Sequence, residues 1–532
     1  MHKELRAFLT QHNKAIGPLH RDYSRSFWEM SLAGTPESVD ALVAAKGRYL
    51  DVYRDRKAFE RLKSWRKEMS GDLGEVSARE LECAYLDFLP YQMDADVLKD
   101  IVYKEAQIEN TFNTFRADLD SRKVSDNELR EMLGSFEDID HRRRVWEASK
   151  QVGEAVAEDV IALVELRNKE ASRLGFADYY ALMLETQEFE EGWLFSLLDE
   201  LESASETAYI NAKAELDQEL KQRFGVPGAA SHPWLYSDPF FQELPSMGVT
   251  RKLDAIFQNQ NLEELTRRHF QSQGMEIDDL LQDADLYERE GKSQHAFCLD
   301  VDHAGDVRVL CNIRPNERWM SVMLHEFGHA VYDKYNDRSL PFALRRPAHT
   351  FTTEAVAMLN GRMTKTPSWL VRFAGVPVET AEEMGEEIFQ ALRSSMLVFV
   401  RWALTLVRFE RELYRDPRQE LGPLWWDLVE RIQKVAPPSD RSRPDWASKI
   451  HLAIVPVYYH NYILGELMAS QVLEYVGREV APDGDMFTPE VGAYMRGQVF
   501  EPGARWAWNS LLERATGEAL TPRHFLRQFD IA

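Results

Sequence analysis

The sequence lacks the features that mark membrane-spanning and disulfide-rich secreted proteins. Its 532 residues include three cysteines, Cys83, Cys298 and Cys311, too few for a disulfide framework. Cys298 and Cys311 can meet across a hairpin, but we expect free thiols. No apolar run approaches the roughly 18 residues of a membrane span. The chain begins MHKELRAFLTQHNKAIG, which has charges but no apolar stretch resembling a secretory signal. We therefore expect a cytoplasmic protein.

The chain also has fewer basic than acidic residues. Lys and Arg total 64 against 88 Asp and Glu, which gives a net charge of −24. A surface this acidic repels phosphate backbones and anionic lipids, so we expect no nucleic-acid partner and no membrane partner. Hydrophobic residues make up 44% of the chain, enough for a large buried core. The sequence makes no prediction of oligomeric state.

Most of the chain has the periodicity of helices. Between residues 142 and 176, Val145, Val156, Val160 and Leu163 follow one helical stripe, and Gly175 is a suitable end. Similar patterns cover residues 1–70, 74–124, 187–223 and 378–415. Breaks rich in Pro and Gly fall near residues 225–248, 338–348, 435–444 and 480–503. None is long or polar enough to separate independent domains, so we expect residues 1–532 to form a single unit of mostly α class.

One segment has the composition of strands. Residues 293–313, SQHAFCLDVDHAGDVRVLCNI, place β-favouring residues on both sides of HAGD, a turn sequence that contains Gly305. This pattern predicts a short β-hairpin just before the most unusual motif of the chain. We expect His303, in the turn, to be a surface residue without a role.

That motif is MLHEFGHAVYD, residues 323–333. On a helix, positions i and i+4 share a face, so His325 and His329 can point at one metal ion, with Glu326 beside them as a base. The alternative is an amphipathic helix with two surface histidines. The apolar neighbours favour the metal site, because bare histidines in a buried helix are costly unless bound or paired. These neighbours are Val322, Met323, Leu324, Phe327, Ala330 and Val331.

A catalytic zinc site takes three protein ligands and leaves one position open. A second helix is predicted to begin around Thr352 with TTEAVAMLNGRM, and Glu354 in its first turn can swing back towards the histidines. The alternative is a glutamate that only complements the helix dipole. A structural zinc site would need a fourth protein ligand, and the sequence offers no clear candidate.

HEFGH followed by a glutamate one helix later resembles the gluzincin metallopeptidases. The stretch HEFGHAVYDKYNDRSLPFALRRPAHTFTTEAV is similar to the angiotensin-converting-enzyme family of peptidyl-dipeptidases, as are QHAFCLDVD and SKIHLAIVPVYYHNYILGE. The resemblance implies a helical ellipsoid with two helical subdomains around a deep central channel, a fold shared with thimet oligopeptidase. It implies one Zn²⁺ per chain, held by His325, His329 and Glu354, with Glu326 as general base and then proton donor.

The resemblance also implies roles for residues that would contact a short peptide substrate. His295 and Ala296 would offer hydrogen bonds to an extended peptide. Lys449 would hold the terminal carboxylate with Tyr459 beside it, and His451 and Tyr462 would donate to the oxyanion. From the residues alone, Lys449 can equally be a solvated residue at a helix start, and the other three can be core residues.

The sequence departs from the family in several places. The spacing after His451 leaves a choice between Tyr459 and Tyr458, and Tyr236 takes the place we assign to a glutamine near the terminal carboxylate. Met358 stands where an acidic residue orients a zinc histidine, and Asn461 replaces an arginine linked to chloride binding.

These features predict a zinc peptidase that releases C-terminal dipeptides from short oligopeptides. Two alternatives stay open. One is an oligoendopeptidase of the thimet or oligopeptidase F type with the same zinc chemistry. The other is a catalytically inactive peptide-binding protein that keeps the fold.

Overall fold

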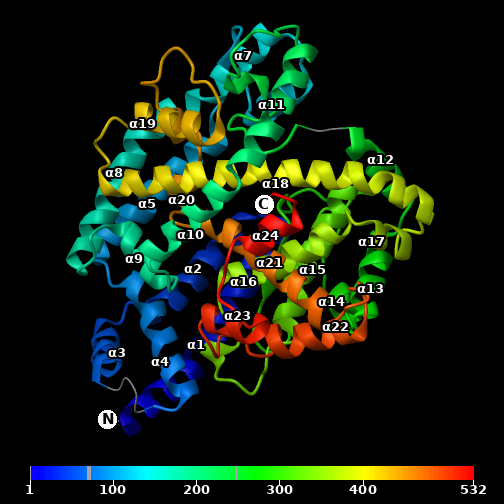
Figure 1. Ribbon diagram of the computed structural model, residues 1–532. Coiled ribbons are helices and arrows are strands. Elements are labelled where there is room, and N and C mark those ends of the chain that lie inside the picture. Colours follow the sequence, from blue (N-terminus) through cyan, green and yellow to red (C-terminus); the bar gives the residue numbers. More distant parts are fainter. Residues whose placement is uncertain (1, 69–72, 246–247, 532) are drawn as a thin grey trace. The chain divides into compact units, whose positions relative to one another are not determined.

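The computed structural model describes residues 2–68, 73–245 and 248–531, and it divides the chain into two compact units. Unit 1 comprises Met1–Gln92, Gly248–Phe389 and Leu464–Gln528, and unit 2 comprises Met93–Met247, Gln390–Ile463 and Phe529–Ala532. Both units are mainly helical (Figure 1), and the described residues contain two antiparallel sheets of two strands each. The predicted mostly α class is confirmed.

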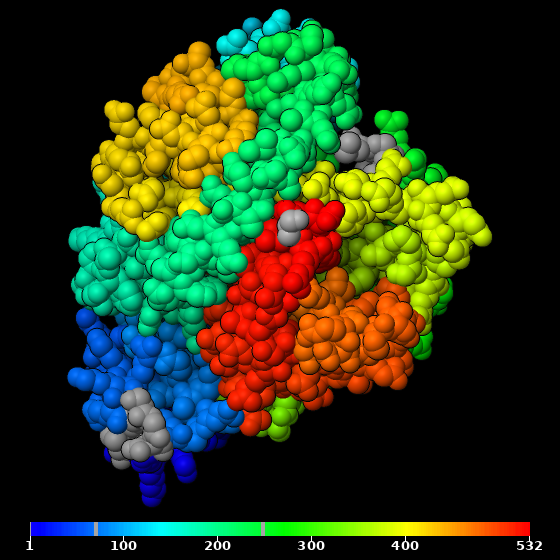
Figure 2. All heavy atoms as spheres, in the orientation of Figure 1, coloured from blue at the N-terminus to red at the C-terminus, as the bar shows by residue number. Residues whose placement is uncertain are grey.

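Unit 1 contains the N-terminal helices, the hairpin that precedes the histidine motif, and the motif helix itself. Its C-terminal helices lie at its surface, orange to red in Figure 2. Its elements are α1 (His2–Ala33), α2 (Pro36–Tyr53), α3 (Arg56–Glu68), α4 (Glu75–Phe88), η1 (Leu89–Tyr91), α12 (Gly248–Phe257), α13 (Leu262–Ser272), α14 (Asp278–Gln282), β3 (Phe297–Asp300), β4 (Val307–Leu310), α15 (Glu317–Lys334), η3 (Phe342–Leu344), α16 (Thr350–Met363), α17 (Pro367–Arg372), α22 (Pro489–Tyr494), η6 (Met495–Phe500), α23 (Trp508–Thr516) and α24 (Arg523–Gln528).

Unit 2 is a second helical body. Its elements are α5 (Ala95–Thr114), β1 (Ala117–Leu119), β2 (Arg122–Val124), α6 (Asp126–Ser135), α7 (Ile139–Ser149), α8 (Gln151–Arg173), α9 (Tyr179–Thr186), α10 (Glu191–Ala204), α11 (Glu206–Arg223), η2 (Pro233–Leu235), α19 (Leu421–Leu428), η4 (Val429–Gln433), η5 (Asp445–Ser448) and α20 (His451–Ile454). Two helices contribute residues to both units, α18 (Val378–Arg415) and α21 (His460–Glu479).

Local sequence explains where several helices begin and end. α15 begins after Asn316, whose side chain accepts the backbone N–H of Trp319. α8 ends as predicted near Gly175, which has φ +96°, and the N–H of Phe176 returns to the carbonyl of Ala171. The predicted run of residues 142–176 is interrupted, because α7 ends at Ser149 and α8 begins after Lys150.

The hairpin predicted within residues 293–313 is present. β3 pairs antiparallel with β4, with Phe297 opposite Leu310 and Asp300 opposite Val307. His303 is not the surface residue we expected. It has a φ of +51°, and its ring stacks on Phe342 and lies 4.3 Å, centroid to centroid, from that of His20. The turn that contains His303 is therefore packed against other parts of unit 1.

The helical prediction for residues 74–124 is wrong at its end. Residues 117–124 form the β1–β2 hairpin, in which Ala117 lies opposite Val124. Asp120 and Ser121 both have positive φ, at 50° and 66°. This is the backbone of a type I′ turn, which favours a two-residue hairpin over continuation of a helix.

The motif helix is buried, as its apolar neighbours predict. Met323, Leu324, Phe327, Ala330 and Val331 have no exposed surface. Within the described ranges, no helix combines the length and apolar character that a membrane crossing requires.

Candidate metal centre and unit 2 cluster

The candidate metal centre is built on two helices of unit 1 that touch backbone to backbone. A Cβ placed on Gly328 of α15 would lie 2.9 Å from Cα of Ala357 of α16, and one on Gly361 would lie 3.1 Å from the carbonyl oxygen of Ser321. The Ser321 hydroxyl also donates to the Gly361 carbonyl at 2.9 Å. Two glycines therefore permit a close approach that larger residues would prevent. The helices are labelled in Figure 1.

This close approach brings the three predicted ligands together. Oε2 of Glu354 lies 3.7 Å from Nε2 of His325 and 3.9 Å from Nε2 of His329. Zinc bonds to imidazole nitrogen and carboxylate oxygen of about 2.0–2.2 Å, arranged tetrahedrally, separate ligand atoms by roughly 3.3–3.6 Å. The observed separations need only a small contraction, so the residues present fit a zinc ion.

The protonation states also suit a metal. Burial lowers the pKa of His325 to about 4, and burial together with the charge of His325 lowers that of His329 to about 3. Both imidazoles are therefore neutral and can offer a lone pair. Burial, and then the charge of Glu466, raise the pKa of Glu354 to about 7. A cation between these groups would offset the cost of burying the carboxylate.

Thr353 supplies the outer contact that the sequence left without a candidate. Its Oγ1 lies 2.7 Å from Nδ1 of His329. If Nε2 binds a metal ion, Nδ1 would carry the proton and donate a hydrogen bond to the hydroxyl, which would fix the orientation of the ring. Thr353 precedes the ligand Glu354, so one turn of α16 provides both contacts. The resemblance to the family indicated position 358, where Met358 stands, and gave no indication of Thr353.

Glu326 is held in place by the hairpin. The backbone N–H of Cys298, in β3, donates to its carboxylate, and the side chain is buried. Burial, and then the charge of Glu354, raise the pKa of Glu326 to about 8. His295 and Ala296 directly precede β3, with His295 exposed and Ala296 half-buried. Their contacts with a peptide stay a prediction.

Lys449 belongs to a buried cluster in unit 2, so the alternative of a solvated lysine is wrong. It is 9% exposed, and its Nζ donates to Oε1 of Gln242 at 2.8 Å. Burial, and then the charge of Arg130, lower its pKa to about 8. Tyr459 lies beside it, with the ring centroid 5.4 Å from Nζ.

Gln242, and not Tyr236, is the residue beside Lys449. The hydroxyl of Tyr236 is buried and donates to Asp217 at 2.8 Å. A loop with Phe241 at φ +51° separates the two residues. The buried carboxylate of Asp238 shapes this loop by accepting the backbone N–H groups of Phe240, Gln242 and Glu243. Because this loop lies between Tyr236 and Gln242, comparing the sequence with the family's motif assigned the glutamine's place to Tyr236 instead of Gln242.

His451 and the tyrosines form a second part of the unit 2 cluster. The ring of Tyr459 lies 5.4 Å from that of His451 and 5.2 Å from that of Tyr462, centroid to centroid. Burial, and then the charge of Lys449, lower the pKa of His451 to about 4. Nδ1 of His451 is buried and has no hydrogen-bond partner within the described ranges. Unit 2 therefore gathers His451, Lys449, Tyr459 and Tyr462 in one place.

A strained turn connects His451 to these tyrosines. Val457 has φ +53°, a conformation that β-branched residues rarely adopt. Its N–H donates to Oε1 of Glu410 at 2.8 Å, and its carbonyl accepts from Nε2 of Gln187 at 2.9 Å. Gln187 also accepts from Nδ2 of Asn461 at 2.8 Å. No local sequence pattern indicates these long-range contacts.

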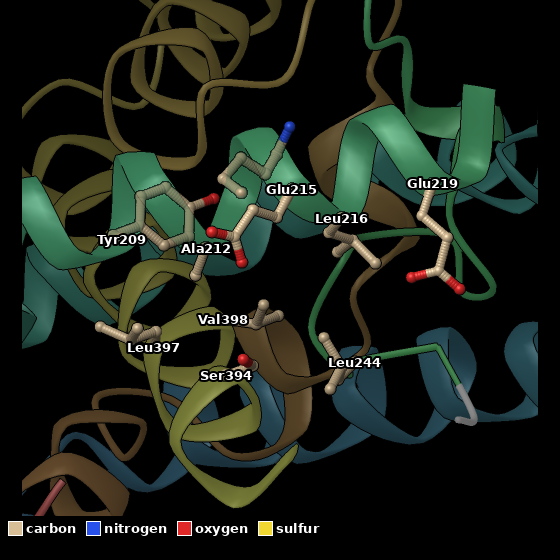
Figure 3. A pocket seen from close by; sticks show the side chains of 10 residues that line it. Tyr209, Ala212, Glu215, Leu216, Glu219, Leu244, Ser394, Leu397 and Val398 are labelled. Atoms are coloured by element: carbon tan, nitrogen blue, oxygen red, sulfur yellow. The ribbon is translucent and has the colours of Figure 1, made fainter. Parts of the chain in front are cut away.

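Unit 2 also contains a small pocket of about 130 Å³ between α11 and α18 (Figure 3). Leu216, Leu397 and Val398 line it together with Glu215 and Glu219. None of the site residues predicted from the sequence is among its lining residues, and we assign it no function.

Comparison with known proteins finds similarity to metallopeptidases. Residues 283–531 match Peptidase family M3. The chain is also similar to the angiotensin-converting enzyme of Rattus norvegicus, with 23% identity over 236 residues. That similarity covers 42% of this chain and 18% of the rat enzyme, so the chain spans a small part of that relative's length. The resemblance to gluzincin metallopeptidases indicated by the motifs is confirmed.

Proposed function

We propose that this protein is a zinc-dependent peptidase that hydrolyses short oligopeptides, because residues 283–531 match Peptidase family M3. The observation that carries the proposal is the convergence of His325, His329 and Glu354, whose ligand atoms all lie within 4.8 Å of one another. Glu326 follows the first of these histidines, as an enzyme of this type requires.

His325, His329 and Glu354 would hold the zinc ion. A zinc ion there would supply Lewis-acid polarisation of the peptide carbonyl and make a water molecule more acidic. The Glu326 carboxylate would accept a proton from the attacking water and then pass it to the leaving amine. The N–H of Cys298 holds that carboxylate in one orientation throughout.

His451 and Tyr462 would stabilise the negative charge that develops on the carbonyl oxygen. A fixed donor at an oxyanion contributes roughly 3–4 kcal/mol to transition-state stabilisation. The unit 2 cluster supports these roles, because it holds the two side chains near Tyr459 and near a strained, hydrogen-bonded turn.

The preferred reaction is the release of C-terminal dipeptides. Lys449 would bind the terminal carboxylate, with Tyr459 and Gln242 as additional donors, and His295 and Ala296 would bind the extended peptide backbone. The support is the burial of Lys449 and its hydrogen bond to Gln242. A buried ammonium discriminates a free C-terminus from a peptide bond within a chain. Cys83, Cys298 and Cys311 form no disulfide, which suits the cytoplasmic location expected from the sequence.

An oligoendopeptidase is the second candidate, because the match to Peptidase family M3 does not distinguish it from a peptidyl-dipeptidase. It would use the same zinc chemistry but would not need a free C-terminus. One peptide prepared with a free carboxylate and with a C-terminal amide separates the two candidates. The dipeptidase predicts that the amide has a much lower kcat/KM, whereas equal values would leave only the oligoendopeptidase.

Turnover by a Glu326→Gln variant tests whether the protein is an enzyme. We expect the zinc content to be kept and hydrolysis of a short peptide to fall by several orders of magnitude. Glu383→Gln, at an exposed position of α18, is the matched control and should keep full turnover. If Glu326→Gln and the control show the same turnover, the activity does not come from this site and the peptide-binding alternative stands.

A further inference from the structure

Three aromatic rings surround the ammonium of Lys449. Its Nζ lies 5.0 Å from the ring centroid of Trp402, 5.4 Å from that of Tyr459 and 5.6 Å from that of Phe240. An aromatic ring attracts a cation that lies over its face within about 6 Å of the ring centroid. These rings favour the charged lysine in a site where burial opposes it. They also limit the positions that its head group can take.

Trp402 makes a second and more specific contact in this cluster. Its indole N–H donates to the hydroxyl oxygen of Tyr459 at 2.8 Å, and the two rings meet edge to face at 88°. Trp402 is fully buried. An indole N–H can only donate, so the phenol oxygen is the acceptor and the phenol proton is left for another partner.

We propose that Trp402 is a specificity-determining residue, which positions the hydroxyl of Tyr459 so that its proton, together with Lys449, recognises the free carboxylate at the end of a peptide. The inference rests on the proposed dipeptidase function and adds a residue to it. Trp402 does not touch the substrate, and it acts through Tyr459. The ligand chemistry is a terminal carboxylate presented to an ammonium and a phenol O–H.

Several hydrogen-bond donors around Lys449 are available to a terminal carboxylate. Nζ of Lys449 donates one hydrogen bond to Oε1 of Gln242. The other N–H groups of Lys449 and the amide N–H₂ of Gln242 can therefore donate to a ligand. The Tyr459 hydroxyl adds a further donor, because its oxygen is already occupied by Trp402. A carboxylate accepts several such bonds, whereas a C-terminal amide offers one oxygen and brings its own N–H₂.

The competing interpretation is that Trp402 only fills the core. Its ring also packs near Phe240 and Trp425, at centroid distances of 5.1 Å and 6.1 Å. Core filling needs the ring and not the N–H. Trp402→Phe keeps an aromatic ring and removes the N–H, so it separates the two interpretations. Trp425→Phe makes the same change at a neighbouring, equally buried tryptophan and is the matched control.

The experiment measures kcat and KM for one peptide as free acid and as C-terminal amide. For Trp402→Phe, we expect KM of the free acid to rise about tenfold, the size of effect that one neutral hydrogen bond produces. We expect kcat of the free acid and kcat/KM of the amide to stay near wild type. Trp425→Phe should leave the ratio of free acid to amide unchanged.

A double substitution makes the test independent of any loss of stability. If Trp402 acts through Tyr459, Trp402→Phe added to Tyr459→Phe should change KM of the free acid no further. Additive effects, equal losses on both substrates, or the same shift in Trp425→Phe would overturn the inference. If the wild type itself does not prefer the free acid, the dipeptidase proposal fails first, and this inference fails with it.

Discussion

The strained turn at Val457 provides a direct test of how unit 2 positions its catalytic candidates. Val457 is fully buried with φ +53°, and its N–H is bonded to the buried carboxylate of Glu410. Replacing Glu410 by Leu would leave that N–H without an acceptor, at a cost of about 1–3 kcal/mol. The left-handed conformation itself costs a further 1–3 kcal/mol or so. Without its acceptor, the turn should relax.

The relaxed turn would move Tyr459 and Tyr462, which follow Val457 closely in the chain. A shift of roughly 1.4–2.8 kcal/mol away from the competent conformation lowers kcat by about ten- to a hundredfold. Glu410→Gln is the matched control. Burial raises the pKa of Glu410 to about 8, and glutamine mimics the neutral acid and keeps an oxygen acceptor. We expect kcat of this variant to stay within about threefold of wild type.

Steady-state kinetics with a fluorogenic peptide, together with thermal unfolding, would measure both effects. The reasoning predicts a fall in kcat for Glu410→Leu that exceeds any change in KM. It is refuted if Glu410→Leu lowers only the unfolding temperature, or if Glu410→Gln loses as much activity as Glu410→Leu.

Three further predictions concern other parts of the site. In the proposed dipeptidase, Lys449 would bind a carboxylate only when protonated, so kcat/KM for a free-acid peptide should fall as pH rises through about 8, while the amide peptide shows no such step. Burial and then the charge of Arg130 lower the pKa of Lys449, whereas the charges of Asp238, Glu243 and Asp126 raise it, so neutralising Arg130 should move the step to higher pH. Gly328→Ala should lower the free energy of unfolding by about 1–3 kcal/mol and weaken zinc binding in a chelator competition, whereas Gly134→Ala, where an added Cβ meets nothing within 4 Å, should do neither. Thr353→Val should weaken zinc binding by about 10- to 100-fold in the same competition and Thr353→Ser should restore it; equal affinities in the two variants would show that the hydroxyl does not orient His329.

The fold was largely predictable because it depends on local patterns. The helical period gave the residue range of α18, and the HAGD turn gave the β3–β4 hairpin. The β1–β2 hairpin was missed because Asp120-Ser121 is a weaker turn signal than Asn-Gly. The helical pattern of α5 predicts that the helix continues through residues 117–124, which form this hairpin instead.

The cluster of His325, His329 and Glu354 was predictable for a similar reason. These residues come from two consecutive helices, and the i, i+4 spacing of the two histidines places them on one helix face. The surroundings of Lys449 in the unit 2 cluster were not predictable in full. Gln242 and Trp402 reach it from elements far apart in the chain, and such pairings depend on tertiary packing, which no local pattern encodes.

The metal content of purified protein tests the central claim most directly. The claim is that His325, His329 and Glu354 together hold one catalytic zinc ion. Elemental analysis after extensive dialysis should find about one zinc per chain in the wild type, and far less in Glu354→Ala when both proteins are folded. A wild type that binds no zinc, or a Glu354→Ala variant that retains it as tightly, would contradict the account.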